Sequence, residues 1–210
     1  MNNSLNLVES FKSAWSSFTR NANIFVLVTL IFLILTILLG SADESRAYAP
    51  IPGVTNTLVS FFASYIMVRL SLTVARGGKA LWKDVFVIRW SEFGWYVLAA
   101  IVTGVISALG LVLLIIPGLF IITRLALSNF AMIDEGLKPI ESIKRSWALT
   151  RGYFWQMFLA GIVIVGLNIV GTALLGIGVL VSSPVSFLFS AYIYEKLREA
   201  SVPVVVEKIA

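Results

Sequence analysis

The chain of 210 residues contains no cysteine and no histidine, and only 13% of its residues are charged. The lack of cysteine excludes disulfides and thiolate nucleophiles, and the lack of histidine excludes an imidazole base and the usual zinc and haem ligand sets. A soluble domain has about 25% charged residues, whereas 59% of this chain is hydrophobic. The composition predicts an integral membrane protein that holds no metal and no cofactor.

Lysine and arginine are almost missing from every second connection between the apolar segments. Of 16 such residues, 13 lie in the N-terminal segment, in residues 76–89, in residues 138–151 and in the C-terminal tail, and the other connections carry only Arg46. The positive-inside rule places those four segments in the cytoplasm, so we expect both termini there. The net charge of +5 is then explained by orientation and by anionic lipid headgroups, and not by nucleic acid.

The apolar stretches are long enough for six membrane-spanning helices arranged as three hairpins. They cover residues 24–39, 54–75, 93–132 and 153–194. The last two stretches each hold two spans and a tight turn. We place the final turn at Gly176-Ile177-Gly178, with Pro184 inside the last helix. In residues 93–132 both Gly110 and Pro117-Gly118 break helices, and Gly110 is preferred because it leaves two more even spans.

Three polar segments beside the spans have the pattern of amphipathic helices at a membrane surface. In residues 4–19 the apolar side chains cover one third of the helix circumference, residues 139–150 repeat this in shorter form, and residues 79–91 are a weaker third case. The side chains expected at the interface are Phe11, Trp15, Phe18, Trp82, Ile143 and Trp147. The alternative is that these helices only pack beneath their own bundle.

Parts of the chain resemble each other. Residues 9–15 and 141–147 share the pattern E-S-(F/I)-K-x-(A/S)-W, and residues 69–73 (RLSLT) resemble residues 124–128 (RLALS). We therefore expect a single membrane domain over residues 1–210. It would be built from three parallel units, each an amphipathic helix followed by a hairpin, at about residues 4–76, 77–133 and 137–200, with a cytoplasmic tail at 201–210.

Arg69 and Arg124 fall within predicted spans, where a guanidinium costs about 2.5–3.5 kcal/mol unless it finds a partner or reaches the interface. One interpretation has both arginines bind an anion inside the bundle, and the other gives them a structural role. Asn129 and Asn168 are further polar residues in spans, and amides can hydrogen-bond across helices. These four are the candidate ligand-binding residues.

Nothing in the sequence predicts catalysis. The only acidic residues expected outside the cytoplasmic face and the termini are Asp43 and Glu44 in an outside connection, so no carboxylate pair stands at membrane depth. Ser182-Ser183 has no base to activate it. We therefore expect that this protein is not an enzyme.

Several motifs in the second half resemble a known family. They are Ile116-Pro117-Gly118, Arg124, the acid pair Asp134-Glu135, the run of residues 141–152 (ESIKRSWALTRG), Pro184 and Tyr194. This pattern resembles a large, mostly uncharacterised group of prokaryotic six-span membrane proteins, which is similar to the membrane domain attached to some glycerophosphodiester phosphodiesterases. The resemblance implies a prokaryotic plasma membrane protein without the phosphodiesterase activity, because the chain has no such domain.

The first functional hypothesis is therefore a non-enzymatic protein that interacts at the cytoplasmic face with membrane lipids through their anionic headgroups, with a partner protein or with a second copy of itself. A small-solute transporter or channel for anions, using Arg69 and Arg124, is one alternative. A membrane-embedded subunit of a larger complex is another.

Overall fold

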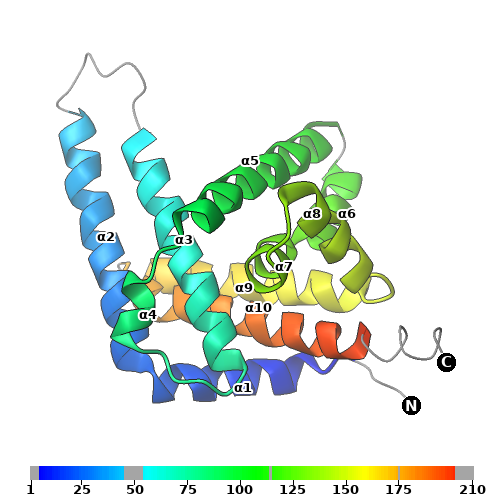
Figure 1. Ribbon diagram of the computed structural model, residues 1–210, viewed down its shortest axis with the longest axis horizontal. Helices are drawn as coiled ribbons and strands as arrows, with labels where there is room; N and C mark the ends of the chain where they lie inside the picture. The colour runs from blue at the N-terminus through cyan, green and yellow to red at the C-terminus, as the bar shows by residue number, and fades with distance from the viewer. Residues whose placement is uncertain (1–4, 45–53, 114, 175, 202–210) are drawn as a thin grey trace.

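The structure, a computed structural model, describes residues 5–44, 54–113, 115–174 and 176–201. Its described elements are all helices, which confirms the all-helical prediction (Figure 1). They are α1 (Leu7–Arg20), α2 (Ala22–Glu44), α3 (Val54–Ala75), α4 (Trp82–Phe86), α5 (Trp90–Leu113), α6 (Ile115–Leu125), α7 (Ser128–Glu135), α8 (Pro139–Leu149), α9 (Phe154–Ala173) and α10 (Val179–Ser201). Of the expected outside connection, residues 41–44 belong to α2, and the remainder lies outside the described residues, as does most of the cytoplasmic tail.

Within the described ranges, four helices are long and apolar enough to cross a membrane: α2, α3, α5 and α9. This agrees with a membrane protein. The other two expected spans look different. The fourth is broken into α6 and α7, of 11 and 8 residues, and α10 carries charged residues in its last turns.

The expected turn at Gly110 is wrong, because Gly110 lies inside α5. The alternative, Pro117, lies in the first turn of α6, where its missing N–H has no helical acceptor to lose. Only residue 114, outside the described residues, separates the two helices. Gly118 instead serves their packing: a Cβ there would lie 2.7 Å from the backbone of Leu111. By contrast, the turn at residues 176–178 is confirmed, and Gly176 has a φ of 77°.

This close approach leads to a test with a matched control. Gly118→Ala is expected to destabilise the protein by about 1–3 kcal/mol, because the new methyl group overlaps the backbone of α5. Gly104→Ala, in the middle of α5 with nothing within 4 Å, should be neutral or stabilising by up to about 1 kcal/mol. Thermal unfolding in detergent, followed by circular dichroism, measures both. Equal melting temperatures for the two variants would contradict the contact.

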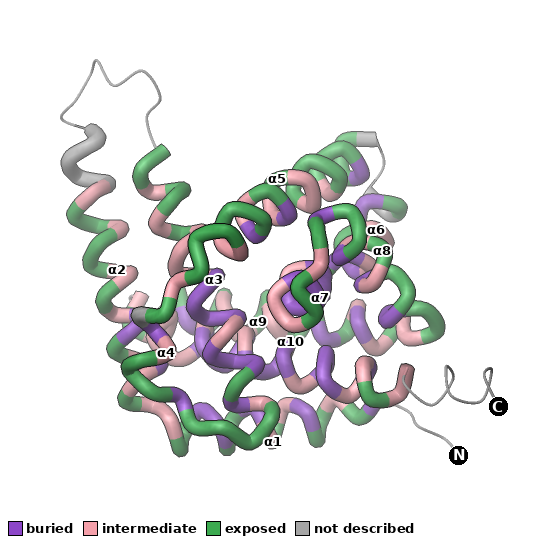
Figure 2. Tube along the Cα trace, viewed as in Figure 1, coloured by how far each residue is buried: buried purple, intermediate pink, exposed green. Residues whose placement is uncertain are grey.

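Helix α10 lies at the centre of the packing. It contacts α1, α2, α3 and α9, and most of its residues from Ser182 to Leu197 are buried (Figure 2). Helix α1 runs along it in the opposite direction at the bottom of Figure 1. The first and last described helices therefore pack against each other.

Candidate functional site

Helix α1 has a face of small residues that docks on α10. Ser10, Ala14 and Ser17 are buried there, and the Ser17 hydroxyl lies 2.6 Å from the Tyr192 hydroxyl. Small side chains allow two helices to approach closely. Phe18, expected at the membrane interface, is instead buried in the core, because it borders this docking face. That expectation is corrected.

Beside the docking face, α1 exposes apolar side chains. Val8 is 64% and Trp15 46% exposed, and Phe11 is half-buried against the ring of Phe189. At 100° per residue the exposed Lys12 follows directly on this flank. Thus packing beneath the bundle uses only part of the apolar face, and the remainder is exposed.

Helix α8 repeats this arrangement. Ser142 and Ser146 are fully buried, while Ile140 is 65% and Trp147 42% exposed. Ile143 is half-buried, and Lys144 is exposed beside the apolar flank. The matching positions of α1 and α8 in the sequence pattern therefore have matching burial.

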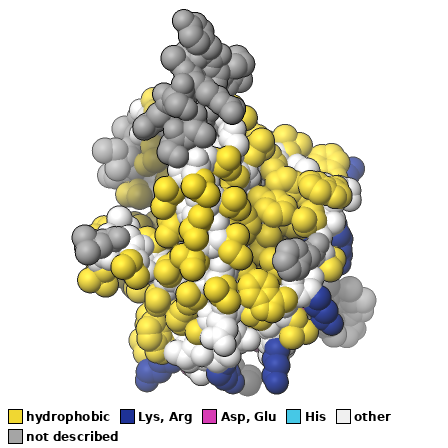
Figure 3. Space-filling view, turned by 90° about the vertical axis from the view of Figure 1, so that its left-hand side faces the viewer, with side chains coloured by type: hydrophobic (Ala, Val, Ile, Leu, Met, Phe, Trp, Pro, Cys, Tyr) yellow, Lys and Arg dark blue, Asp and Glu magenta, His cyan; other side chains and the backbone are white. Residues whose placement is uncertain are grey.

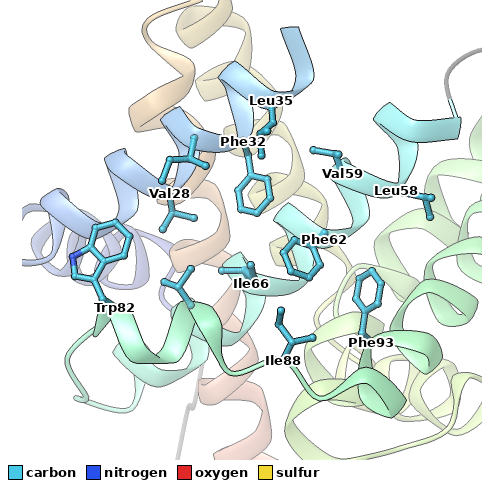
Figure 4. A pocket seen from close by; sticks show the side chains of 12 residues that line it. Val28, Phe32, Leu35, Leu58, Val59, Phe62, Ile66, Trp82, Ile88 and Phe93 are labelled. Atoms are coloured by element: carbon cyan, nitrogen blue, oxygen red, sulfur yellow. The ribbon is translucent and has the colours of Figure 1, made fainter. Parts of the chain in front are cut away.

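The third expected amphipathic helix is only one turn, α4, and it forms the floor of an apolar groove. The groove measures about 470 Å³ and lies between α2 and α3 (Figure 4). Trp82 and Val85 of α4 line it, together with rings such as Phe32 and Phe62. Figure 3 shows that apolar side chains cover most of this face of the molecule, with Lys and Arg side chains along its lower edge.

The side chain of Arg69, in α3, contacts the segment that follows α4. Its guanidinium donates a hydrogen bond to the carbonyl of Val87 and lies 5.6 Å from the centre of the Tyr65 ring. Arg124 is arranged similarly. Its guanidinium lies 5.1 Å from the centre of the Phe120 ring and 5.5 Å from that of Trp147 in α8.

Each of these arginines thus stacks on the ring four residues before it and contacts the next polar segment along the chain. Such cation–π contacts compensate part of the cost of placing a guanidinium among apolar groups. The described contacts of Arg69 and Arg124 are with different neighbours.

One side-chain hydroxyl, that of Ser146, hydrogen-bonds to the backbone on both sides of the break between α6 and α7. Ser146 of α8 donates to the carbonyl of Arg124 at 2.7 Å and accepts from the N–H of Leu127 at 3.2 Å. Both backbone groups would otherwise lack a helical partner in the interior, where an unpaired backbone group is costly. A discontinuous helix of this kind is tolerated in a membrane protein where it is buried or lines a cavity.

A cavity of about 450 Å³ does adjoin this break. Asn129 and Asn168, both singled out from the sequence, line it together. Asn168 donates to Ser186 of α10 at 3.0 Å and so bonds across helices as expected. Asn129 contributes an amide oxygen that is buried without a hydrogen-bond partner among the described residues.

At the ends of α3, α7 and α10 four charged side chains form a closed ring. Arg76 pairs with Asp134 and with Glu195, and Arg198 pairs with the same two carboxylates at 3.0 and 2.7 Å. The side chains of Asp134 and Glu195 are only 4% and 8% exposed. Tyr194 also donates to Asp134, at 2.8 Å. Because the two positive and two negative charges balance, the ring joins three helices without a net buried charge.

Sequence reasoning missed this ring. The acid pair at residues 134–135 was noted only as part of a family pattern, and Arg76 only as an orientation charge. The sequence did contain a signal for it. The acidic residues Asp134 and Glu195 and the arginines Arg76 and Arg198 all lie at the expected cytoplasmic ends of predicted spans, and therefore at a similar depth.

Comparison with known families gives one match. The model of a family described as a domain of unknown function, DUF7847, matches residues 85–209, which is more than half of the chain. No curated protein and no solved structure matches.

Proposed function

We propose that this chain, which belongs to the DUF7847 family, is a non-enzymatic membrane protein that binds anionic lipids at the cytoplasmic interface. The observation that carries the proposal is the shared layout of α1 and α8. Each has a buried docking face, an exposed apolar flank with a tryptophan, and a lysine beside that flank. Tryptophan prefers the headgroup level and lysine attracts anionic lipid.

The groove on α4 supports a role in lipid binding. Its lining is apolar throughout, and its floor contains Trp82 at the level of the neighbouring Lys83. An acyl chain can fill such a groove while its headgroup stays at the basic lower edge of Figure 3. With those basic edges toward the cytoplasm, both termini of this prokaryotic plasma membrane protein lie inside.

The proposal includes six spans in three units, with α6 and the part of α7 up to Met132 as one discontinuous span and α10 as the last. Three similar contacts support it. The second helix of each hairpin contacts the next polar segment: Arg69 of α3 contacts Val87 after α4, and Arg124 of α6 contacts Trp147 of α8. For α10 the next segment would be α1 of the first unit, and Tyr192 contacts Ser17 there. The three units would therefore close into a ring.

The absence of cysteine makes a direct test simple. A fluorophore on Val8→Cys, in full-length protein reconstituted into nanodiscs, should be quenched by nitroxide-labelled lipid, because this flank meets the membrane. A fluorophore on Ser16→Cys, exposed on the polar side of the same helix, should be quenched far less. At equal mole fractions, labelled anionic lipid should be enriched about fivefold over neutral lipid, which corresponds to about 1 kcal/mol for one lysine near the surface.

Lys12→Gln should remove most of that preference while leaving the contrast between residues 8 and 16 unchanged. Equal quenching at both positions would show that α1 does not lie in the interface. If Lys12→Gln keeps the preference for anionic lipid, charges other than Lys12 cause that preference.

A further inference from the structure

The cavity beside the broken helix is lined by hydrogen-bonding side chains from five helices. These are Ser64 of α3, Tyr96 of α5, Asn129 of α7, Asn168 of α9, and Ser183, Ser186 and Ser190 of α10. Ser64 stands near the middle of α3, one of the four helices with the length and composition of a span. Polar side chains at such depth are costly and mark functional sites more often than polar side chains near the surface.

The polar side chains of this cavity are uncharged, and the rest of its lining is apolar. Among the described residues that form it there is no Lys, Arg, Asp or Glu. Arg69 lines a different pocket, with Arg76 and Asp134, and Arg124 is stacked between aromatic rings. A free ion would find no opposite charge in this cavity, so its chemistry suits a neutral molecule.

Most of the lining groups already have partners within the protein. Tyr96 donates to Ser64 at 3.0 Å, Asn168 donates to Ser186 at 3.0 Å, and Ser190 donates to the carbonyl of Ser186 at 2.9 Å. Among the buried polar atoms of the lining, the exception is the amide oxygen of Asn129, which has no partner in the part of the chain that the structure describes. A buried acceptor without a donor is rare in folded proteins, and it requires an explanation such as a ligand.

The ligand that completes this site must donate a hydrogen bond to Asn129, and it must also match hydroxyls that are already donating and can still accept. A hydroxyl group can donate and accept through one oxygen. A molecule with several hydroxyls can therefore meet Asn129 and the serines of α10 together. The volume of about 450 Å³ falls in the range of about 300–1,000 Å³ usual for small-molecule sites.

We propose that this cavity binds an uncharged polyol, held by Asn129 and by the hydroxyls of α3, α5 and α10. The polyol is either a free solute or the headgroup of a neutral lipid, since both present the same hydroxyls. This site is separate from the flanks of α1 and α8, so it does not depend on the lipid-binding role proposed above.

The test uses full-length protein and two probes. Glycerol binding to protein in detergent micelles is followed by saturation-transfer NMR, and retention of a monoglycosyl diacylglycerol from nanodiscs is followed by native mass spectrometry. Asn129→Leu keeps the approximate size of the side chain but removes the acceptor. It should lower the affinity for the probe that binds by at least about tenfold. Asn23→Leu is the control, because Asn23 is an exposed amide that does not line the cavity.

Ser190→Ala is the second variant, in case Asn129→Leu does not fold. Among the described residues its hydroxyl bonds only within α10, so folding should persist while probe binding falls about threefold to fivefold. Binding of glycerol would identify a free solute, and binding of the glycolipid alone would identify a lipid headgroup. If neither probe binds, or if binding is the same in Asn129→Leu, Ser190→Ala and the wild type, the proposal is wrong.

Discussion

Replacing Asp134 by asparagine is expected to destabilise the folded protein by about 2–4 kcal/mol, because it removes one of two buried carboxylates from a closed ring of ion pairs. Glu195 alone would then face the two guanidinium groups of Arg76 and Arg198. Breaking a fully buried pair costs about 3–5 kcal/mol. The two arginines are partly exposed, so water compensates some of this loss.

The same ring makes stability depend on acidity. Burial alone would raise the pKa of Asp134, but hydrogen bonds from Arg76 and Tyr194 and the charges of Arg76 and Arg198 hold this pKa below its ordinary value of 3.8. A carboxyl group whose pKa is lower in the folded state stabilises the protein above its unfolded pKa, and this contribution is lost as the pH falls through the folded pKa. The advantage of the wild type over Asp134→Asn should therefore shrink below about pH 4.

The free energy of unfolding, measured by titration with a denaturing detergent in mixed micelles, tests both statements. Glu9→Gln is the control. Glu9 pairs with Lys196 at 3.0 Å, but its side chain is mostly exposed, and exposed pairs contribute at most about 1 kcal/mol. Similar losses in the two variants would contradict the special position of Asp134.

The second large effect is expected from Ser146→Ala. The hydroxyl of Ser146 bonds to two backbone groups, the Leu127 N–H and the Arg124 carbonyl, at the break between α6 and α7. Alanine would leave both groups unpaired in the interior, and each buried unpaired group costs about 1–3 kcal/mol. We expect a total loss of about 2–5 kcal/mol, read from the same unfolding titration.

Ser142→Ala is the matched control for Ser146→Ala. Ser142 lies one turn earlier on the same helix and is equally buried, but its hydroxyl donates only to the carbonyl of Pro139 within the first turn of α8. Its loss should cost about 1 kcal/mol or less. If the two alanine variants unfold at the same detergent fraction, the hydroxyl of Ser146 does not hold the break together.

The helices were largely predictable because long apolar runs and amphipathic segments have unambiguous periods. The turn in residues 93–132 was not. Glycine marks a turn in a soluble protein, but at Gly118 it marks the point where two helices touch. The division of the expected fourth span into α6 and α7 was also not predicted, since it depends on Ser146, which lies 22 residues from Arg124.

The candidate site was predictable only in part. Hydropathy identified Asn129 and Asn168 as polar residues within apolar runs, and the structure places both in one cavity. Sequence similarity indicated that Arg69 and Arg124 are equivalent residues. Their contact partners, Val87 and Trp147, lie in segments that this similarity did not include. Phe18 was misplaced because a helical wheel shows which side chains are apolar but not which neighbour covers them.

The contact between the first and last described helices also governs how the protein is made. Ser17 and Tyr192 are 175 residues apart, and a ribosome that adds about 5–20 residues per second needs roughly 10–35 seconds to produce the second after the first. During this interval α1 has no α10 to cover Ser10 and Ala14. If α1 lies in the interface as proposed, the exposed flank of Val8 and Trp15 holds the new N-terminal helix on the membrane surface until α10 has been made, and α1 docks only then.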